Sequence, residues 1–420
     1  MGRMFRTTLS RTAALTTPLA LLAACGTAAV PDAGAGQDPP AGAEAQAGAK
    51  ARPGSVMLAA GEQTDLGART GRGRPAIHVP RAASPDSGGT TVPGGTTVPG
   101  GTTVPGGTTV PGAPNCPMFP ASNIWNTDIS KLPVNPHSAA WMRSMDSAST
   151  FLHPDFGPNP GGFPYGIPYN IVTSAHRLVP VKFRYASESD KGPYPFGAST
   201  LIEGGKNADG DRHAIMVNKS TCTLYELWEA RYSASGSTAG SGAIWNLAAN
   251  RLRPAGWTSA DAAGLPILPG LLNYGQVRAA VRSGRPITHA IRFTAQATRS
   301  AYLWPARHEA GSGANPALPP MGARFRLKAG FNVAGFCASS TPYCADAKAV
   351  LTEMRHYGLI LADNGSNWFF QGSAFPQWPG ALVSLLKQIP ARAFQAIDES
   401  CLMVSPKSGR AAAKPGCPIG

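Results

Sequence analysis

The segment DRHAIMVNKSTCTLYELWEA, residues 211–230, places a histidine and two glutamates inside a pattern that is typical of a buried β-hairpin. A turn centred on Lys219–Ser220 would set His213 opposite Glu226, on the same face of the hairpin. Charges within an apolar strand must be paired. The two residues are therefore either a structural pair that fixes the strand register, or a catalytic pair in which His213 orients Glu226.

Two further carboxylates could complete an acid–base site with Glu226. Asp211 continues the face that carries His213, and Asp363 ends the apolar run LILAD just before a predicted Asn-Gly turn. Glycoside cleavage normally uses two carboxyl groups, about 5–5.5 Å apart for retention or 6.5–9.5 Å apart for inversion. We therefore predict that Glu226 works together with Asp363 or Asp211.

Aromatic side chains and isolated histidines near the strand ends are candidates for substrate binding, through stacking on sugar rings and hydrogen bonding. The candidates are His289, His308, Trp228, Tyr225 and Trp304. An alternative use of the histidines is a three-histidine metal site formed by His213, His289 and His308, because metal ligands can converge from distant strands. The leading interpretation needs no metal and no cofactor.

Strand patterns dominate the second half of the chain and predict the fold class. Short β-branched or aromatic runs are bounded by Gly, Pro and Ser loops, and 49 Gly and 40 Pro disfavour a helical bundle. We predict a mainly β domain, a two-layered β-sandwich or jelly roll with a few peripheral helices. The predicted strands are 177–185, 213–218, 222–230, 289–294 and 300–306.

One long helix is predicted over 341–358, with Thr and Pro at its start, an apolar stripe, and Gly358 at its end. Shorter helices are predicted at 136–146, 259–263, 275–282 and 380–389.

The N-terminal part has the pattern of an export signal followed by a tether. Arginines precede a short apolar run that ends in Leu22-Ala23-Ala24-Cys25, which resembles the lipobox of bacterial lipoproteins. The resemblance implies cleavage after residue 24 and lipidation of Cys25. The low-complexity composition of residues 25–115 predicts a disordered tether, and this segment contains four GGTTVP repeats. The tether would hold a single domain, 116–420, away from a membrane.

Seven cysteines fit an exported protein if Cys25 carries lipid and the other six form disulfides. Cys337 and Cys344 bracket a short loop and are predicted to pair. The sequence leaves open how the remaining four, Cys116, Cys222, Cys401 and Cys417, are connected.

The formal net charge of +14 suits an acidic partner such as an anionic glycan or cell wall. Several enzyme classes are disfavoured, because the chain has no GxSxG elbow, Walker A, dinucleotide-binding, HExxH or EF-hand motif. The segments GDRHAI, CTLYELWEA, LPILPGLL and LILADNGSNW resemble a group of secreted bacterial and fungal proteins, which implies an extracellular role.

Together these features predict a lipid-anchored, monomeric surface enzyme that cleaves an extracellular polysaccharide, most simply a glycoside hydrolase, with no nucleic-acid partner. One alternative is a lyase that acts on a uronic-acid polymer, with His213 or Tyr225 as the base. Another alternative is a non-catalytic glycan-binding module in which the His213–Glu226 pair is structural.

Overall fold

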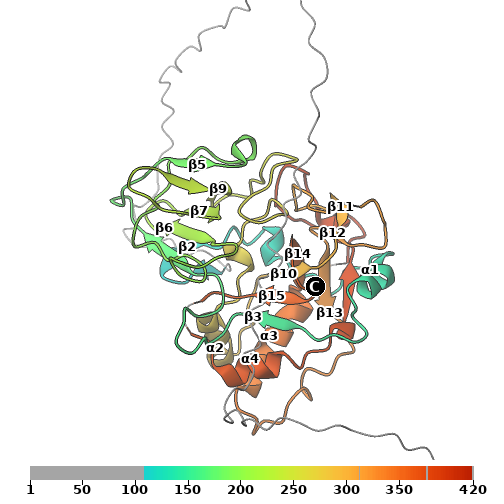
Figure 1. Cartoon of the computed structure of the whole chain (residues 1–420). Helices are drawn as coiled ribbons and strands as arrows, with labels where there is room; N and C mark the ends of the chain where they lie inside the picture. Colours follow the sequence, from blue (N-terminus) through green and yellow to red (C-terminus); the bar gives the residue numbers. More distant parts are fainter. Residues whose placement is uncertain (1–107, 312, 375–376, 419–420) are drawn as a thin grey trace, which may run out of the picture. The chain divides into compact units, whose positions relative to one another are not determined.

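The structure is a computed structural model that describes residues 108–311, 313–374 and 377–418 (Figure 1). The predicted signal peptide, Cys25 and most of the tether lie outside the described residues. The described part opens with a two-stranded hairpin of β1 and β2, so the strand structure begins before the domain boundary predicted at residue 116.

The described residues form a mixed α/β domain with more strand than helix and with several sheets. The first eight strands are β1 (Thr109–Val110), β2 (Ala113–Pro117), β3 (His153–Asp155), β4 (Tyr169–Val172), β5 (Val181–Phe183), β6 (Ala214–Asn218), β7 (Thr223–Trp228) and β8 (Ser237–Ala239). The next eight are β9 (Ser241–Asn246), β10 (Ile291–Ala295), β11 (Arg299–Tyr302), β12 (Pro320–Met321), β13 (Arg324–Leu327), β14 (Leu359–Asn364), β15 (Phe369–Gln371) and β16 (Phe394–Ile397). The α-helices are α1 (Ser138–Ser144), α2 (Tyr274–Ser283), α3 (Cys344–His356) and α4 (Gly380–Leu386).

The largest sheet has six strands in the order β16-β13-β14-β10-β15-β3. Its pairing is mixed, because β10 runs parallel to β14 and β15 runs parallel to β3, whereas the other neighbours are antiparallel. β10, β13 and most of β14 are buried throughout, as expected of strands covered on both faces.

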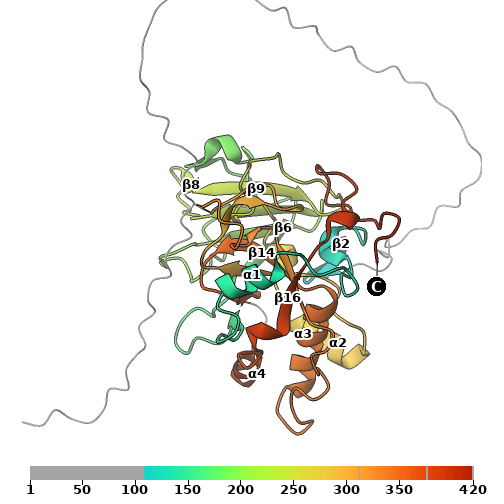
Figure 2. The same cartoon turned by 90° about the vertical axis from the view of Figure 1, so that its right-hand side faces the viewer.

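A second sheet has four strands in the order β4-β6-β7-β9, with β4 parallel to β6. Figures 1 and 2 both place this sheet at the end of the domain opposite to α2, α3 and α4. The prediction of a strand-rich domain with a few helices is thus confirmed. The parallel pairs in both sheets differ from the all-antiparallel pairing of a jelly roll.

α3 shows why the long helix could be predicted from its apolar stripe. Val350, Leu351 and Met354 are fully buried, and the helix packs on β13 with α2 and α4 beside it. The chain leaves the helix at Gly358, whose φ of +70° is accessible to glycine at little cost. The predicted helices at 136–146, 275–282 and 380–389 correspond to α1, α2 and α4. The one predicted at 259–263 is wrong, because this segment forms turns.

The β6–β7 hairpin is present, but its predicted register is wrong by two residues. Ile215 lies opposite Glu226 and Val217 opposite Leu224, so the turn occupies residues 219–222. A shift of two residues leaves every side chain on its predicted face. His213 and Glu226 therefore share a face, but they are not opposite each other.

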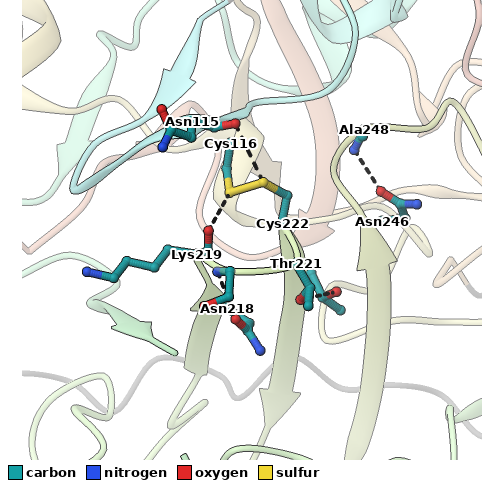
Figure 3. Close-up of a disulfide and its surroundings, with 10 residues drawn as sticks. Asn115, Cys116, Asn218, Lys219, Thr221, Cys222, Asn246 and Ala248 are labelled. Atoms are coloured by element: carbon teal, nitrogen blue, oxygen red, sulfur yellow. Dashed lines mark hydrogen bonds between the residues drawn. A yellow bond between two sulfur atoms is a disulfide. The ribbon is translucent and has the colours of Figure 1, made fainter. Parts of the chain in front are cut away.

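Three disulfides crosslink the described residues: Cys116–Cys222, Cys337–Cys344 and Cys401–Cys417. The predicted Cys337–Cys344 pair is confirmed, with the two Cα atoms 5.8 Å apart. Figure 3 shows the Cys116–Cys222 bond joining the segment of β2 to the turn of the β6–β7 hairpin. Three disulfides are consistent with an oxidising location outside the cytoplasm.

Among the described residues, no helix combines the length and the apolar character that crossing a bilayer requires.

Candidate functional site

A polar pocket lies where one face of the six-stranded sheet meets the segment 203–213 that leads into β6. We call the sheet side the floor and this segment the wall. The floor residues are Asp155, Arg292, Thr294, Asp363, Phe369 and Gln371. The wall residues are Glu203, Asp211 and His213.

Strand register explains why the floor side chains converge. Thr294 pairs with Asp363 on one side and with Phe369 on the other, and directly paired residues point to the same face. Gln371 lies two residues beyond Phe369 and pairs with Asp155, which extends the same face to the edge strand β3. The strands β3, β10, β14 and β15 thus contribute to one surface, although β3 and β10 are distant in sequence from the other two.

The wall is fastened by backbone contacts and by one buried arginine. Glu203 N–H donates to the carbonyl of His213 (2.9 Å), which closes the loop between them. The guanidinium of Arg212 donates to the carbonyls of Lys206 (3.0 Å), Ala208 (2.6 Å) and Ala230 (3.2 Å). Because Arg212 holds the loop from inside, the positions of Asp211 and His213 on either side of it are set before any ligand binds.

His213 is buried, and both of its ring nitrogens face oxygen acceptors. Nδ1 lies 2.7 Å from Oε2 of Glu203, and Nε2 lies 3.0 Å from the carbonyl oxygen of Ala260. Burial would lower the pKa of His213, but the charge and hydrogen bond of Glu203 outweigh it and raise the pKa to about 9. At neutral pH the imidazole is therefore charged and donates both protons.

Asp211 is half-buried beside this pair. Its Oδ1 accepts a hydrogen bond from Nε1 of Trp228 at 3.3 Å. One ligand atom from each of Glu203, Asp211 and His213 lies within 4.8 Å of the other two. The wall thus presents two carboxylates and one imidazole at a single point of the pocket.

Arg292 crosses the floor as the partner of a buried carboxylate. Its Nε and Nη2 donate to the two oxygens of Asp261, at 2.8 and 2.6 Å, and Nη2 lies 3.7 Å from Oδ2 of Asp363. The charge of Asp261 raises the pKa of Arg292 against the effect of burial, so the guanidinium stays charged. Two donors in a planar fork match the carboxylate geometry.

Asp363 has a different environment from Asp211. It is 5 % exposed, and its Oδ1 accepts the N–H of Asn364 at 2.7 Å. Burial is the largest cause that raises the pKa of Asp363 well above its usual range; the nearby Asp261 charge adds to it, and Arg292 opposes it. Asp363 therefore keeps its proton to a higher pH than an exposed aspartic acid does.

Three of the four predicted catalytic residues, Asp211, His213 and Asp363, come together in this pocket. Glu226 does not line it. The carboxylate of Glu226 is fully buried and accepts the backbone N–H groups of Ile267 (3.0 Å) and Leu268 (2.9 Å). Glu226 thus has a structural role, because its carboxylate accepts the backbone N–H groups of a buried turn. The predicted direct pair of Glu226 with His213 is wrong, because His213 binds Glu203.

The predicted substrate-binding residues do not line the pocket. His289 is fully buried between Gln276 and Glu353, and His308 binds the carbonyl of Ala262. His213, His289 and His308 have separate partners and do not form the three-histidine site. In the described ranges, the only group of three side chains that could hold a metal ion includes one of these histidines, His213.

The aromatic candidates have structural contacts. Trp304 Nε1 donates to the carbonyl of Ser408, and Tyr225 packs against Tyr194 in a smaller hydrophobic cluster. Trp228 reaches the site indirectly, through its hydrogen bond to Asp211.

Sequence reasoning missed Glu203, Asp155 and Arg292. A charge inside an apolar strand was the signal that identified His213, and the same signal was present for Arg292 in HAIRFT. Glu203 and Asp155 lie in Gly- and Pro-rich surroundings that predict only loops, so nothing in their neighbourhood marked them as pocket residues.

Comparison with known proteins provides no further assignment: no family model, no curated protein and no solved structure matches the chain.

Proposed function

We propose that the domain is a hydrolase that cleaves an extracellular polysaccharide, with Asp363 as the general acid and Asp211 as the general base. The observation that carries this proposal is the contrast between two carboxyl groups of one pocket. Asp363 is a buried floor residue whose pKa is raised well above its usual range, and Asp211 is a half-exposed wall residue. In glycosidases, two carboxyl groups in different environments differ in protonation state, so that one acts as the general acid and the other as the general base.

In the proposed reaction, Asp363 donates its proton to the leaving glycosidic oxygen while Asp211 removes a proton from the attacking water. Glu203 and His213 form an ion pair beside Asp211 and hold the wall in place. The charged Arg292 is fixed by Asp261 on the floor, and its charge opposes the rise in the pKa of Asp363.

The small size of the pocket favours hydrolysis of a polysaccharide chain that lies across its opening. Its water-accessible volume is about 30 Å³, which is room for a water molecule or two but not for a sugar ring. Phe369 lines this space and stacks on His153, with ring centroids 4.0 Å apart and planes at 11°. A flat aromatic pair at the edge of the site provides a surface for the apolar face of a sugar.

The pocket chemistry does not favour the lyase alternative. Four acidic residues, Asp155, Glu203, Asp211 and Asp363, line it, and those that are ionised would repel the carboxylate of a uronic acid. Tyr225, one of the two bases considered for a lyase, does not line the pocket. The glycan-binding alternative remains an outcome of the test below.

The location of this activity is part of the proposal. Lipidation of Cys25 would anchor the chain at the cell surface, and the Gly-, Pro- and Thr-rich segment between Cys25 and the domain would let the domain reach a polymer outside. The disulfides in the domain support export, because such bonds persist in oxidising compartments.

The test is to incubate the exported chain with a panel of neutral and acidic polysaccharides and to measure new reducing ends. Asp363→Asn and Asp211→Asn should each lower the rate by roughly 10²–10⁴, the usual contribution of a general acid or base. Glu309→Gln, which changes an exposed carboxylate outside the pocket, should leave the rate unchanged.

Full activity in both Asp variants would disprove the acid–base assignment. Products that absorb in the near ultraviolet would show an unsaturated sugar and hence a lyase. A polysaccharide that binds to the wild-type chain without being cut would identify a binding module.

A further inference from the structure

The wall of the pocket also gathers the donor atoms of a metal site. Glu203, Asp211 and His213 each offer one ligand atom, and these atoms lie within 4.8 Å of one another. Ligands at 2.0–2.2 Å from an ion lie about 3–4.4 Å from each other. Small side-chain rotations would therefore bring the three atoms around one ion. We infer that Glu203, Asp211 and His213 bind one divalent transition-metal ion, with two carboxylates in the places of the His289 and His308 ligands that the sequence-based alternative assigned.

The surroundings of His213 provide an observation that is independent of the two carboxylates. Nε2 faces the carbonyl oxygen of Ala260 at 3.0 Å, so this nitrogen must carry a hydrogen. The other nitrogen, Nδ1, faces the carboxylate of Glu203 at 2.7 Å, and once it releases its proton it offers the lone pair that an ion requires. Histidines that ligate metals commonly donate their second N–H to a backbone carbonyl in this way, which fixes the ring orientation.

The charge of the pocket also favours a cation. Four residues with carboxyl groups line the pocket, and one of its two basic residues, Arg292, already forms two hydrogen bonds with Asp261. This local excess of acid occurs in a chain with a net charge of +14, so overall composition does not explain it. A divalent ion would take the place of the proton now shared between His213 and Glu203, and it would offset the charge of Asp211.

The donor set indicates which ions should bind best. An imidazole nitrogen with two carboxylate oxygens suits Zn²⁺ or Mn²⁺ better than Ca²⁺, which prefers six to eight oxygen ligands. Three protein ligands leave coordination positions open towards the water-accessible space of the pocket. This inference stands apart from the proposed hydrolysis. If both hold, Asp211 acts as a ligand, and the ion holds the water that Asp211 would otherwise activate.

Metal binding can be measured without a substrate. The full chain, treated with a chelator and dialysed, is titrated calorimetrically with ZnCl₂, MnCl₂ and CaCl₂ in separate experiments. We expect one Zn²⁺ or Mn²⁺ per chain with a much weaker response to Ca²⁺. Glu203→Gln and Asp211→Asn should each weaken binding at least tenfold, whereas Glu309→Gln should bind like the wild type.

Circular dichroism of each variant shows whether the chain has folded. If Glu203→Gln fails to fold, the result for Asp211→Asn decides, because Asp211 is half-exposed and its side chain accepts a long hydrogen bond of 3.3 Å from Trp228. No Zn²⁺ or Mn²⁺ binding by the wild type, or equal affinity in the folded variants and the wild type, would overturn the inference. Metal binding by a chain that cuts no polysaccharide would support this inference and contradict only the proposed function.

Discussion

The three disulfides should stabilise the domain unequally, and the Cys116–Cys222 bond should contribute most. A crosslink restricts the unfolded chain, and in the chain-entropy model its contribution grows with the logarithm of the loop that it closes. The bonded cysteines are separated by 106 residues in this pair, by 16 in Cys401–Cys417 and by 7 in Cys337–Cys344. At 25 °C the model gives stabilisations of about 4.8, 3.1 and 2.5 kcal/mol, respectively.

Three double variants test this order, each with both cysteines of one pair replaced by alanine. Their free energies of unfolding are measured by urea titration under non-reducing conditions, which leave the other two bonds intact. The Cys116/Cys222 variant should lose roughly 2 kcal/mol more than the Cys337/Cys344 variant, from the difference between the two loops. An equal loss in both, or a larger loss in the Cys337/Cys344 variant, would refute the argument that loop length controls these contributions.

Two further predictions concern buried charges. Burial raises the pKa of Glu353 well above 4.5, so above about pH 4.5 the unfolded chain loses this proton before the folded chain does. Stability should therefore fall by up to about 1.4 kcal/mol per pH unit until the folded carboxyl titrates. Glu353→Gln should reduce the fall in melting temperature between pH 4.5 and 7. The same pH dependence in the variant and the wild type would contradict this assignment. Arg292→Met should cost roughly 3–5 kcal/mol in a denaturant titration, because it leaves the buried Asp261 without its partner. Arg285→Met, at an exposed position, should cost little; an equally small loss for Arg292→Met would show that the buried pair contributes nothing.

The β6–β7 hairpin shows how far sequence reasoning reaches. Alternation of side chains assigned His213 and Glu226 to one face, and this is correct because the period of two survives the register shift. The register itself was wrong because Cys222 belongs to the turn, with a φ of +51°, and is bonded to Cys116. A crosslink to a distant strand helps to set this turn, and local patterns contain no information about it.

The site was predictable to a similar degree. Asp211, His213 and Asp363 are polar residues at the ends of apolar strands, and this pattern singled out three residues that line one pocket. Their convergence depends on the parallel pairing of β10 with β14 and on the loop that brings Glu203 next to His213. Both are long-range features, and periodicity within a strand cannot specify which strands become neighbours.

The link between β2 and the β6–β7 turn also has a mechanical consequence. If the chain is held at its N-terminal end and the domain engages a large polymer, tension enters the described structure at β1 and β2. The short β1–β2 ladder would open first, since its few hydrogen bonds can separate one after another. The load would then reach Cys116 and pass through a covalent bond to Cys222, into the turn of a hairpin whose strands are both paired on their outer sides. The disulfide would thus act as a stop that keeps pulling forces away from the strands that form the pocket floor.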